Sequence, residues 1–361
     1  MLRREHDPEA AWDRDFDRWL APFLAQLRHK AQRRWCPVYL HGLLAPGERK
    51  SIEPMAARVA KGQSQQLHHF VTVSAWDAPA FESLLLEKAA ALVGGADAHL
   101  IIDDTALVKQ GSHSVGVAHQ YCGQLGKGTN CQALVSLTLA RNEVPVPIAL
   151  RLYLPKAWTT DRARCEAAGV PEAILFRTKW KIALDEIERV RRAGVVFGDV
   201  LADAGYGACR EFREGLSAMG LTWAVGISPD QLVYADDTSV ELPASTTRTG
   251  RPRTLGVPST PPGKAREVVH ALGRAAFHKV RWRRGTKGML TASFAALRVR
   301  IADGPKVLGH RHGPGASAWL VCERRSGGET KFYVTNHPPD TPLQRLASVI
   351  KARWSCEQAH Q

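Results

Sequence analysis

The sequence lacks the features that mark disulfide-bonded, secreted or membrane-spanning proteins. Its seven cysteines are odd in number and never form a C-x-x-C pair, which argues against a disulfide framework or a zinc ribbon. No apolar run approaches the roughly 20 residues that a bilayer-spanning helix needs. The start MLRREHDPEAAWDRDF is too charged for a signal peptide. These absences predict a soluble protein of a reducing cytoplasm.

Acidic residues are also scarce. The 35 Asp and Glu stand against 49 Lys and Arg, so the formal net charge is +14 and the sequence pI is about 9.7. Such a surface attracts polyanions, nucleic acid first and an acidic membrane surface second. Most of the excess falls within residues 241–312, where fifteen Lys and Arg face three acids. This concentration predicts contact with DNA.

Within that basic region, the segment HKVRWRRGTKG packs cations around one tryptophan, Trp282. Phosphate neutralisation beside an aromatic platform is typical of surfaces that bind nucleic acid. The alternative is that Trp282 is a core residue of a strand. The predicted DNA-binding cations of this segment are Arg281, Arg283, Arg284 and Lys287.

The chain is nonetheless rich enough in hydrophobic residues, at 44%, to bury a core, and 361 residues predict a large domain with appendages. Apolar residues at helical spacing indicate helices through the first hundred residues, with Pro22 as a possible kink, and again over residues 172–193. Short β-branched runs indicate strands from His99 onward, including HLIIDDT, CQALVSLTLA and VPIALRLYLP. We therefore expect a mixed α/β (α+β) fold.

This pattern predicts four regions. They are a helical, DNA-binding N-terminal region (1–95), the first part of an α/β core (96–215), a basic β-rich insertion (216–340) and a C-terminal core helix (341–361).

Two acids follow buried-strand patterns. Asp103 ends the run HLIID, with Asp104 next to it, and Asp203 ends VVFGDVLAD. Each alone is weak, because acids commonly end strands, but strands that end together would bring the carboxylates to one divalent ion. A third candidate, Glu357, lies four residues after Arg353 on a predicted helix, so the two would share one face. An ordinary surface salt bridge is the alternative for that pair.

Four segments together resemble a known family, the insertion-sequence-four-like DDE transposases, and in particular their seven-oh-one branch. The segments are RKSIEPMAARV, IIDDT with HSVGVAHQYCGQLGK, LADAGYG and ARWSCEQ.

The resemblance implies a ribonuclease-H-like catalytic core, with acids at Asp103 (Asp104 as the fallback), Asp203 and Glu357 holding two Mg²⁺ ions, for which Mn²⁺ can substitute. It implies that Arg353 grips a phosphate and that Trp282 stacks on an extruded base. It also implies a DNA transposase that cuts insertion-sequence ends and joins them to target DNA, acting as a homodimer on paired ends in the bacterial nucleoid.

The match to the family's C-terminal signature is incomplete, because Ile350 replaces a tyrosine and the expected lysine would fall beyond Gln361. The predicted catalytic helix is therefore shortened. Two rival hypotheses follow: a DNA-binding remnant that no longer cleaves, and a stand-alone metal nuclease on the same core. A zinc site at His310, His312 and Cys322 is disfavoured, because it lacks paired cysteines.

Overall fold

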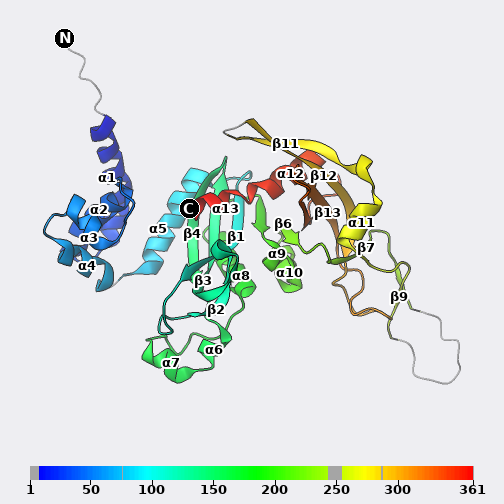
Figure 1. The fold of residues 1–361 in the computed structure, drawn as a ribbon, viewed down its shortest axis with the longest axis horizontal. Coiled ribbons are helices and arrows are strands. Elements are labelled where there is room, and N and C mark those ends of the chain that lie inside the picture. Colours follow the sequence, from blue (N-terminus) through cyan, green and yellow to red (C-terminus); the bar gives the residue numbers. More distant parts are fainter. Residues whose placement is uncertain (1–7, 75, 243–253, 286–287, 361) are drawn as a thin grey trace, which may run out of the picture. The chain divides into compact units, whose positions relative to one another are not determined.

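The computed structural model describes residues 8–74, 76–242, 254–285 and 288–360. The chain divides into two compact units, Met1–Lys88 and Ala89–Gln361, which are described separately. Figure 1 shows the elements of both. Among the described residues, no helix is long and apolar enough to cross a membrane.

The first unit is helical, as predicted. Its core is apolar and includes Leu20, Met55, Leu67 and Phe70. Pro22 lies inside the first helix without ending it. The helices are α1 (Pro8–Gln26), α2 (Lys30–Leu44), α3 (Ile52–Val59), α4 (Ser64–Thr72) and the start of α5 (Ala78–Val93).

The second unit is built on a mixed sheet. Its central strands run in the order β4-β3-β1-β5-β6, in which β4, β3 and β1 are antiparallel neighbours and β1, β5 and β6 are parallel. The predicted mixed α/β fold class, with a mixed sheet flanked by helices, is therefore confirmed. The strands are β1 (His99–Val108), β3 (Lys127–Arg141), β4 (Val144–Leu152), β5 (Asp199–Ala202) and β6 (Thr222–Ile227).

Some strands were not predicted, among them one beside the core. β2 (Ala118–Cys122) pairs with the beginning of β3, before the short 3₁₀ turn η1 (Gly123–Leu125). Its sequence AHQYC has little alternation of apolar and polar residues, so its pairing depends on the long edge that β3 offers.

Helices cover both faces of this sheet. Successive residues of a strand point to opposite faces. Asp103 contacts Arg353, at the junction of α12 (Leu343–Ala352) and α13 (Ser355–Ala359), whereas Asp104 contacts Lys179 of α8 (Lys179–Arg192). The two helical layers therefore lie on opposite sides of β1. The remaining core helices are α6 (Lys156–Thr159), α7 (Arg162–Ala167), α9 (Ala204–Gly207) and α10 (Arg210–Ala218).

The β-rich insertion continues the same sheet. β14 pairs with the core strand β6, and β13, β12 and β7 follow in turn, giving twelve strands among the described residues. Because β6 belongs to the core, the insertion begins after Ile227 rather than at residue 216. Its elements are β7 (Leu232–Ala235), β8 (Val240–Glu241), β9 (Val257–Pro258), β10 (Gly263–Lys264), α11 (Ala265–Ala271), η2 (Arg274–Ala276), β11 (His278–Gly285), β12 (Gly288–Ile301), β13 (Ser317–Arg324) and β14 (Thr330–Thr335).

Candidate active site

The first two predicted acids lie level with each other on two neighbouring parallel strands: Asp103 is the fifth residue of β1, and Asp203 directly follows β5. In the β1–β5 pairing, Ile102 stands opposite Ala202. Asp103 and Asp203 are the next residues on each strand, so their positions along the sheet are equivalent. The signal that predicted them, an apolar strand ending in an acid, holds for Asp203, whereas β1 continues beyond Asp103 to Val108.

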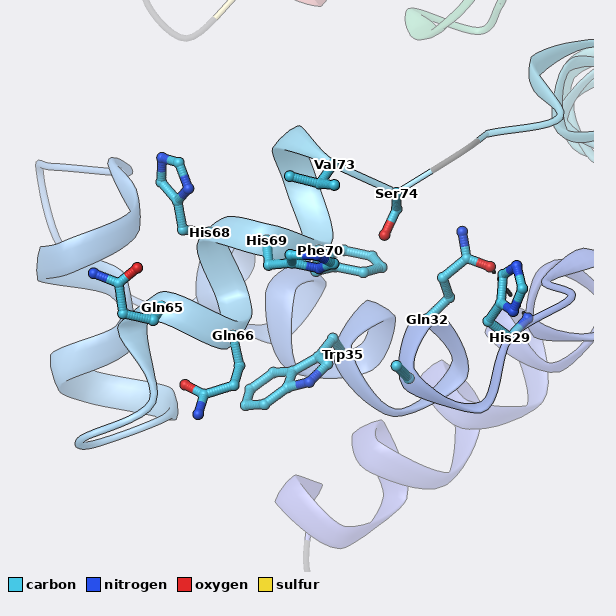
Figure 2. A pocket seen from close by; sticks show the side chains of 11 residues that line it. His29, Gln32, Trp35, Gln65, Gln66, His68, His69, Phe70, Val73 and Ser74 are labelled. Carbon is cyan, nitrogen blue, oxygen red and sulfur yellow. Dashed lines mark hydrogen bonds between the residues drawn. The ribbon is translucent and has the colours of Figure 1, made fainter.

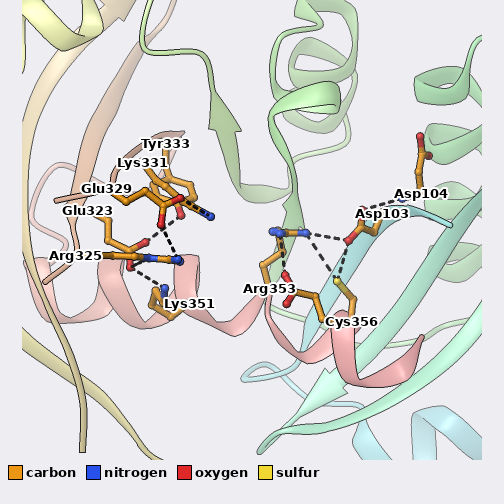
Figure 3. A network of polar contacts seen from close by, with 11 residues as sticks. Asp103, Asp104, Glu323, Arg325, Glu329, Lys331, Tyr333, Lys351, Arg353 and Cys356 are labelled. Carbon is orange, nitrogen blue, oxygen red and sulfur yellow. Dashed lines mark hydrogen bonds and ion pairs between the residues drawn. The ribbon is translucent and has the colours of Figure 1, made fainter. Parts of the chain in front are cut away.

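Asp103 is held from three directions. Its Oδ2 accepts hydrogen bonds from Arg353 NH1 at 2.9 Å and from the Cys356 thiol at 3.1 Å. Its Oδ1 accepts the backbone N–H of Asp104 at 2.8 Å. The carboxylate therefore has a fixed orientation toward the C-terminal helices (Figure 3).

Asp203 caps the short helix α9. Its Oδ1 accepts the backbone N–H groups of Gly205, at 2.9 Å, and Tyr206, at 3.2 Å. Burial raises the pKa of Asp203 above its ordinary value, and the negative charges of Asp103 and Asp104 raise it further. Crowded, partly desolvated carboxylates of this kind bind a cation favourably.

Asp104, the fallback for the first acid, has other partners. Its Oδ1 accepts the Tyr206 hydroxyl at 2.7 Å, and its Oδ2 accepts the Lys179 ammonium at 2.5 Å. Both oxygens are thus engaged by groups of α8 and α9. Tyr206 in turn follows Asp203 by three residues, so this hydrogen bond ties the segment that carries the second acid to β1.

The prediction that one helix carries both Arg353 and Glu357 is wrong. α12 ends at Ala352, and α13 begins at Ser355 with Glu357 in its first turn. Between them, the backbone amides of Trp354, Cys356 and Glu357 donate to carbonyls three residues earlier. These are the hydrogen bonds of a 3₁₀-type turn rather than of an α-helix. The predicted pair survives, since Arg353 NH2 lies 3.4 Å from Glu357 Oε1.

Arg353 links all three predicted acids. Burial alone would lower the pKa of Arg353. The carboxylate of Asp103, followed by those of Asp203 and Glu357, raises it instead. The guanidinium is therefore the positive centre of the acidic group.

The three predicted acids do not form a metal-binding group in this structure. Among the described residues, no group of three or more His, Cys, Asp or Glu is placed to hold a metal ion. Glu357 is about half exposed, with 52% of its side chain accessible, and its named partner is Arg353. The oxygen donors of Asp103 and Asp203 fit a hard divalent cation, whereas the role of Glu357 as a third ligand stays a prediction.

The predicted DNA-binding residues of the insertion lie on β11. Trp282 is half-buried and packs edge-to-face on Phe294 at 6.0 Å, while the Lys351 ammonium lies 4.8 Å from its ring centroid. Arg281 and Arg284 are exposed. Arg283 is less exposed and pairs with Glu143 at 3.3 Å. Lys287 lies outside the described residues.

A cavity of about 450 Å³ is lined by residues of β11 and of the C-terminal helical segment. Its aromatic and cationic lining includes Trp282, Trp354, Tyr333, Arg325, Lys331 and Arg353, with Glu357 as its acid. Arg283 stacks on Trp354 at 3.9 Å beside it. The predicted third acid, the predicted phosphate ligand and the predicted aromatic platform therefore share one cavity.

A buried ion pair forms the wall of this cavity. Glu323 of β13 accepts from Lys351 of α12 at 2.8 Å, from Arg325 at 3.0 Å and from the Tyr333 hydroxyl at 3.2 Å (Figure 3). Although burial opposes the charge of Glu323, these donors lower its pKa below the ordinary value. The pair fixes the insertion against the helix that leads to Arg353.

Sequence reasoning missed several residues of the site. Tyr206 lies inside the motif LADAGYG, and Cys356 adjoins Glu357, so both were within quoted segments. Lys179 and Glu323 carry no local signal, because their partners are distant in the sequence. Glu323 lies in the run AWLVCERR, where the sequence does not distinguish a buried glutamate from an exposed one.

Comparisons with known proteins agree with this geometry. Residues 22–289 match the family described as DDE superfamily endonuclease, a span that includes Asp103 and Asp203 and ends before Glu357. The chain is 32% identical over 197 residues to a probable transposase for insertion sequence element IS701 from Microchaete diplosiphon. That alignment covers 54% of this chain and 49% of the relative, so the chain spans about half the length of the curated relative it matches.

Two solved structures show looser similarity. The piggyBac transposase synaptic complex with hairpin DNA aligns with 95% of this chain and 64% of its own, at a TM-score of 0.41 and 9% identity. The Drosophila P element transposase strand transfer complex aligns with 54% of this chain and 37% of its own, at a TM-score of 0.21 and 11% identity. Neither alignment is close enough to carry a role to a residue. The family match spans most of the sequence, and the chain belongs to the DDE superfamily endonucleases.

Proposed function

We propose that this chain is the catalytic part of a DNA transposase that cuts the ends of its own insertion sequence and joins them to target DNA. The observation that carries the proposal is the pair Asp103 and Asp203, at equivalent positions on adjacent parallel strands, with Arg353 beside them. The family match and the transposase relative support it.

In this proposal Asp103, Asp203 and Glu357 hold two Mg²⁺ ions, with Mn²⁺ as a substitute. Bound there, the ions would lower the pKa of a water molecule and screen the charge that develops on the phosphate. In this proposal Asp103 is the first acid rather than Asp104, because Asp103 is level with Asp203 on the sheet and pairs with Arg353, which also interacts with Asp203 and Glu357.

The residues of the chain then act on two successive phosphodiester displacements. Water attacks phosphorus at the element's end, the bond to the 3′ oxygen breaks, and a free 3′-hydroxyl remains. That hydroxyl attacks a target phosphate and expels the neighbouring 3′ oxygen, so one bond forms for each one broken. Arg353 binds a phosphate oxygen near the reacting centre, and cations of the insertion bind the backbone on either side.

The predicted partners are duplex DNA, both terminal repeats and target, and a second copy of the chain on the paired end. The exposed Arg281 and Arg284 would meet the backbone. Trp282 would stack on a base only if the DNA reached the cavity where Lys351 now covers its ring. The helical unit would supply a further DNA contact.

The deciding test is cleavage of a labelled duplex that carries the element's own end, with Mg²⁺ or Mn²⁺ at matched low salt. The parent chain is compared with Asp203→Ala and with Asp340→Ala, an exposed aspartate in the turn before α12. We expect cleavage and joining by the parent and by Asp340→Ala, and neither by Asp203→Ala.

Other outcomes identify the rival hypotheses. Cleavage of duplexes that lack the terminal repeat, without joining, would identify a stand-alone nuclease. DNA binding that is sensitive to salt, with no cleavage by the parent or by either variant, would identify a DNA-binding remnant.

A further inference from the structure

The helical unit contains two short helices joined by a tight turn. α3 ends at Val59, and α4 begins at Ser64. In the turn between them, Gly62 has a φ of +76°, a conformation that glycine adopts without strain. Both helices pack on α2. Two short helices linked by a turn of this length that contains glycine are the arrangement found in helix-turn-helix units.

The composition of α4 is unusual for a surface helix. Its sequence SQQLHHFVT buries Leu67 and Phe70, three residues apart, and contains no Asp, Glu, Lys or Arg. An ordinary solvated face carries charged side chains, often in oppositely charged pairs. The exposed side chains of α4 are instead neutral hydrogen-bonding groups: Gln65, Gln66, His68, His69 and Thr72.

These side chains line a groove. A cavity of about 900 Å³ lies between α4 and the first turns of α2. Figure 2 shows Gln65, Gln66 and His68 around it, with the rings of Trp35 and Phe70 between the two helices. The groove therefore offers amide and imidazole groups along one wall and an apolar base.

The charge around the groove is positive. α2 contains no acid, and its exposed Arg34 lies near the start of α4, while Lys61 is exposed in the turn before α4. Arg34 stacks over Trp35 at 5.3 Å and donates to Gln63 at 3.3 Å, which fixes it at the start of α4. Cations thus flank a reading face that is itself uncharged.

From this arrangement we propose that α4 is a recognition helix that enters the major groove of duplex DNA, where Gln65, Gln66, His68 and His69 contact base edges. Glutamine can donate to and accept from one adenine at the same time, and a major groove about 12 Å wide admits an α-helix. Arg34 and Lys61 bind the flanking phosphates, which orient the helix without reading sequence.

The inference deepens the proposed transposase function by assigning sequence recognition to a named helix, and it is tested by binding alone. The full chain, without divalent metal, is used to select duplexes from a random-sequence pool. The double variant Gln65→Ala/Gln66→Ala is compared with Gln26→Ala, which removes an exposed glutamine of the same unit that does not line the groove. Circular dichroism checks that each variant keeps its helices.

We expect the parent and Gln26→Ala to enrich the same motif. The double variant should bind that motif about fivefold to a hundredfold more weakly, as expected for the loss of base contacts, while its affinity for scrambled duplexes stays unchanged. An Arg34→Ala/Lys61→Ala variant should instead weaken binding to all duplexes and reduce its dependence on salt.

Two results would overturn the inference: the same motif and affinity for the parent and the Gln65/Gln66 double variant, or no motif enriched by the parent. If the enriched motif occurs at the ends of the element that encodes the chain, α4 reads the terminal repeat; if it occurs at insertion sites, α4 reads target DNA. Because no cleavage is measured, an inactive catalytic centre would leave these outcomes interpretable.

Discussion

Two aspartates at opposite ends of one strand show how differently the same side chain is used. Asp199 opens β5, and its carboxylate lies 3.0 Å from His337 Nε2, 3.2 Å from His99 Nδ1 and 2.8 Å from the Arg345 guanidinium. Asp203 directly follows β5 and lies near two further acids. Both are desolvated, yet the pKa of Asp199 is lowered by its donors and that of Asp203 is raised.

The difference distinguishes an acid stabilised by its partners from the proposed metal ligand. Asp199 is surrounded by enough donors to make its charge a source of stability. Asp203 accepts backbone N–H groups and is attracted by Arg353, but burial and the negative charges of Asp103 and Asp104 disfavour its ionised form. Excess negative charge at the carboxyl end of the strands is the property that a metal-binding site requires, and substitutions at the two positions should therefore have opposite effects.

The largest effect is expected for Asp203→Asn. The amide can still cap α9, but it removes the negative charge, so cleavage should fall by about a thousandfold or more, corresponding to about 4 kcal/mol. The melting temperature should stay the same or rise, because a repelled buried charge is lost. A clear drop in melting temperature would show that Asp203 is structural, and the comparison would fail. Activity assays and thermal unfolding of one preparation provide both readings.

Asp199→Asn should behave in the opposite way. It breaks a buried ion pair and leaves His99, His337 and Arg345 without their shared charge, so the free energy of unfolding should fall by about 3 kcal/mol. Cleavage per folded molecule should remain near the parent value, since the site lies at the other end of the strand. Urea unfolding measures the first quantity, and activity normalised to folded protein measures the second.

The parent and Asp199→Asn should also differ in how much folding stability each loses at low pH. Because the folded-state pKa of Asp199 lies below the unfolded value, its contribution is present above the ordinary pKa of aspartate and is lost as pH falls through the folded value. The parent should therefore lose more stability than Asp199→Asn between about pH 6 and about pH 3. Equal losses in urea unfolding at the two pH values would contradict this role for Asp199.

A smaller effect is expected for Tyr206→Phe. The change deletes the hydrogen bond to Asp104 and loosens the link between α9 and β1, so Mg²⁺ affinity should fall about tenfold, as is typical for a group that orients metal ligands. Metal titration followed by calorimetry gives this affinity independently of cleavage. A matched Tyr234→Phe variant removes the hydroxyl that donates to His312 in the insertion and should leave Mg²⁺ affinity unchanged.

The sequence predicted local features better than distant ones. The strands carrying Asp103 and Asp203 were found because an apolar run followed by an acid is a local pattern. The helix predicted from residue 172 begins only at Lys179, because Ile174, Leu175 and Phe176 are exposed rather than packed. Periodicity marks a possible face, but only the folded chain determines whether that face is covered.

The relation between Asp103 and Arg353 could not be derived from spacing. The two residues are 250 positions apart, and their contact depends on the sheet, the insertion and the bend between α12 and α13. The family resemblance predicted a phosphate ligand at Arg353, but it did not predict that Arg353 would bind the first acid directly. The assignment of α4 as a reading helix similarly required knowing which of its side chains are exposed.

The 250-residue separation between Asp103 and Arg353 also matters for the time at which the site forms. During synthesis, β1 leaves the ribosome long before the segment that carries Arg353, and closing such a long loop is among the slower events of folding. A nascent chain with β1, β3 and β4 in place would have neither Arg353 nor Glu357 beside its acids. The proposed catalytic site is thereby completed only after the sheet that bears the basic insertion has been made.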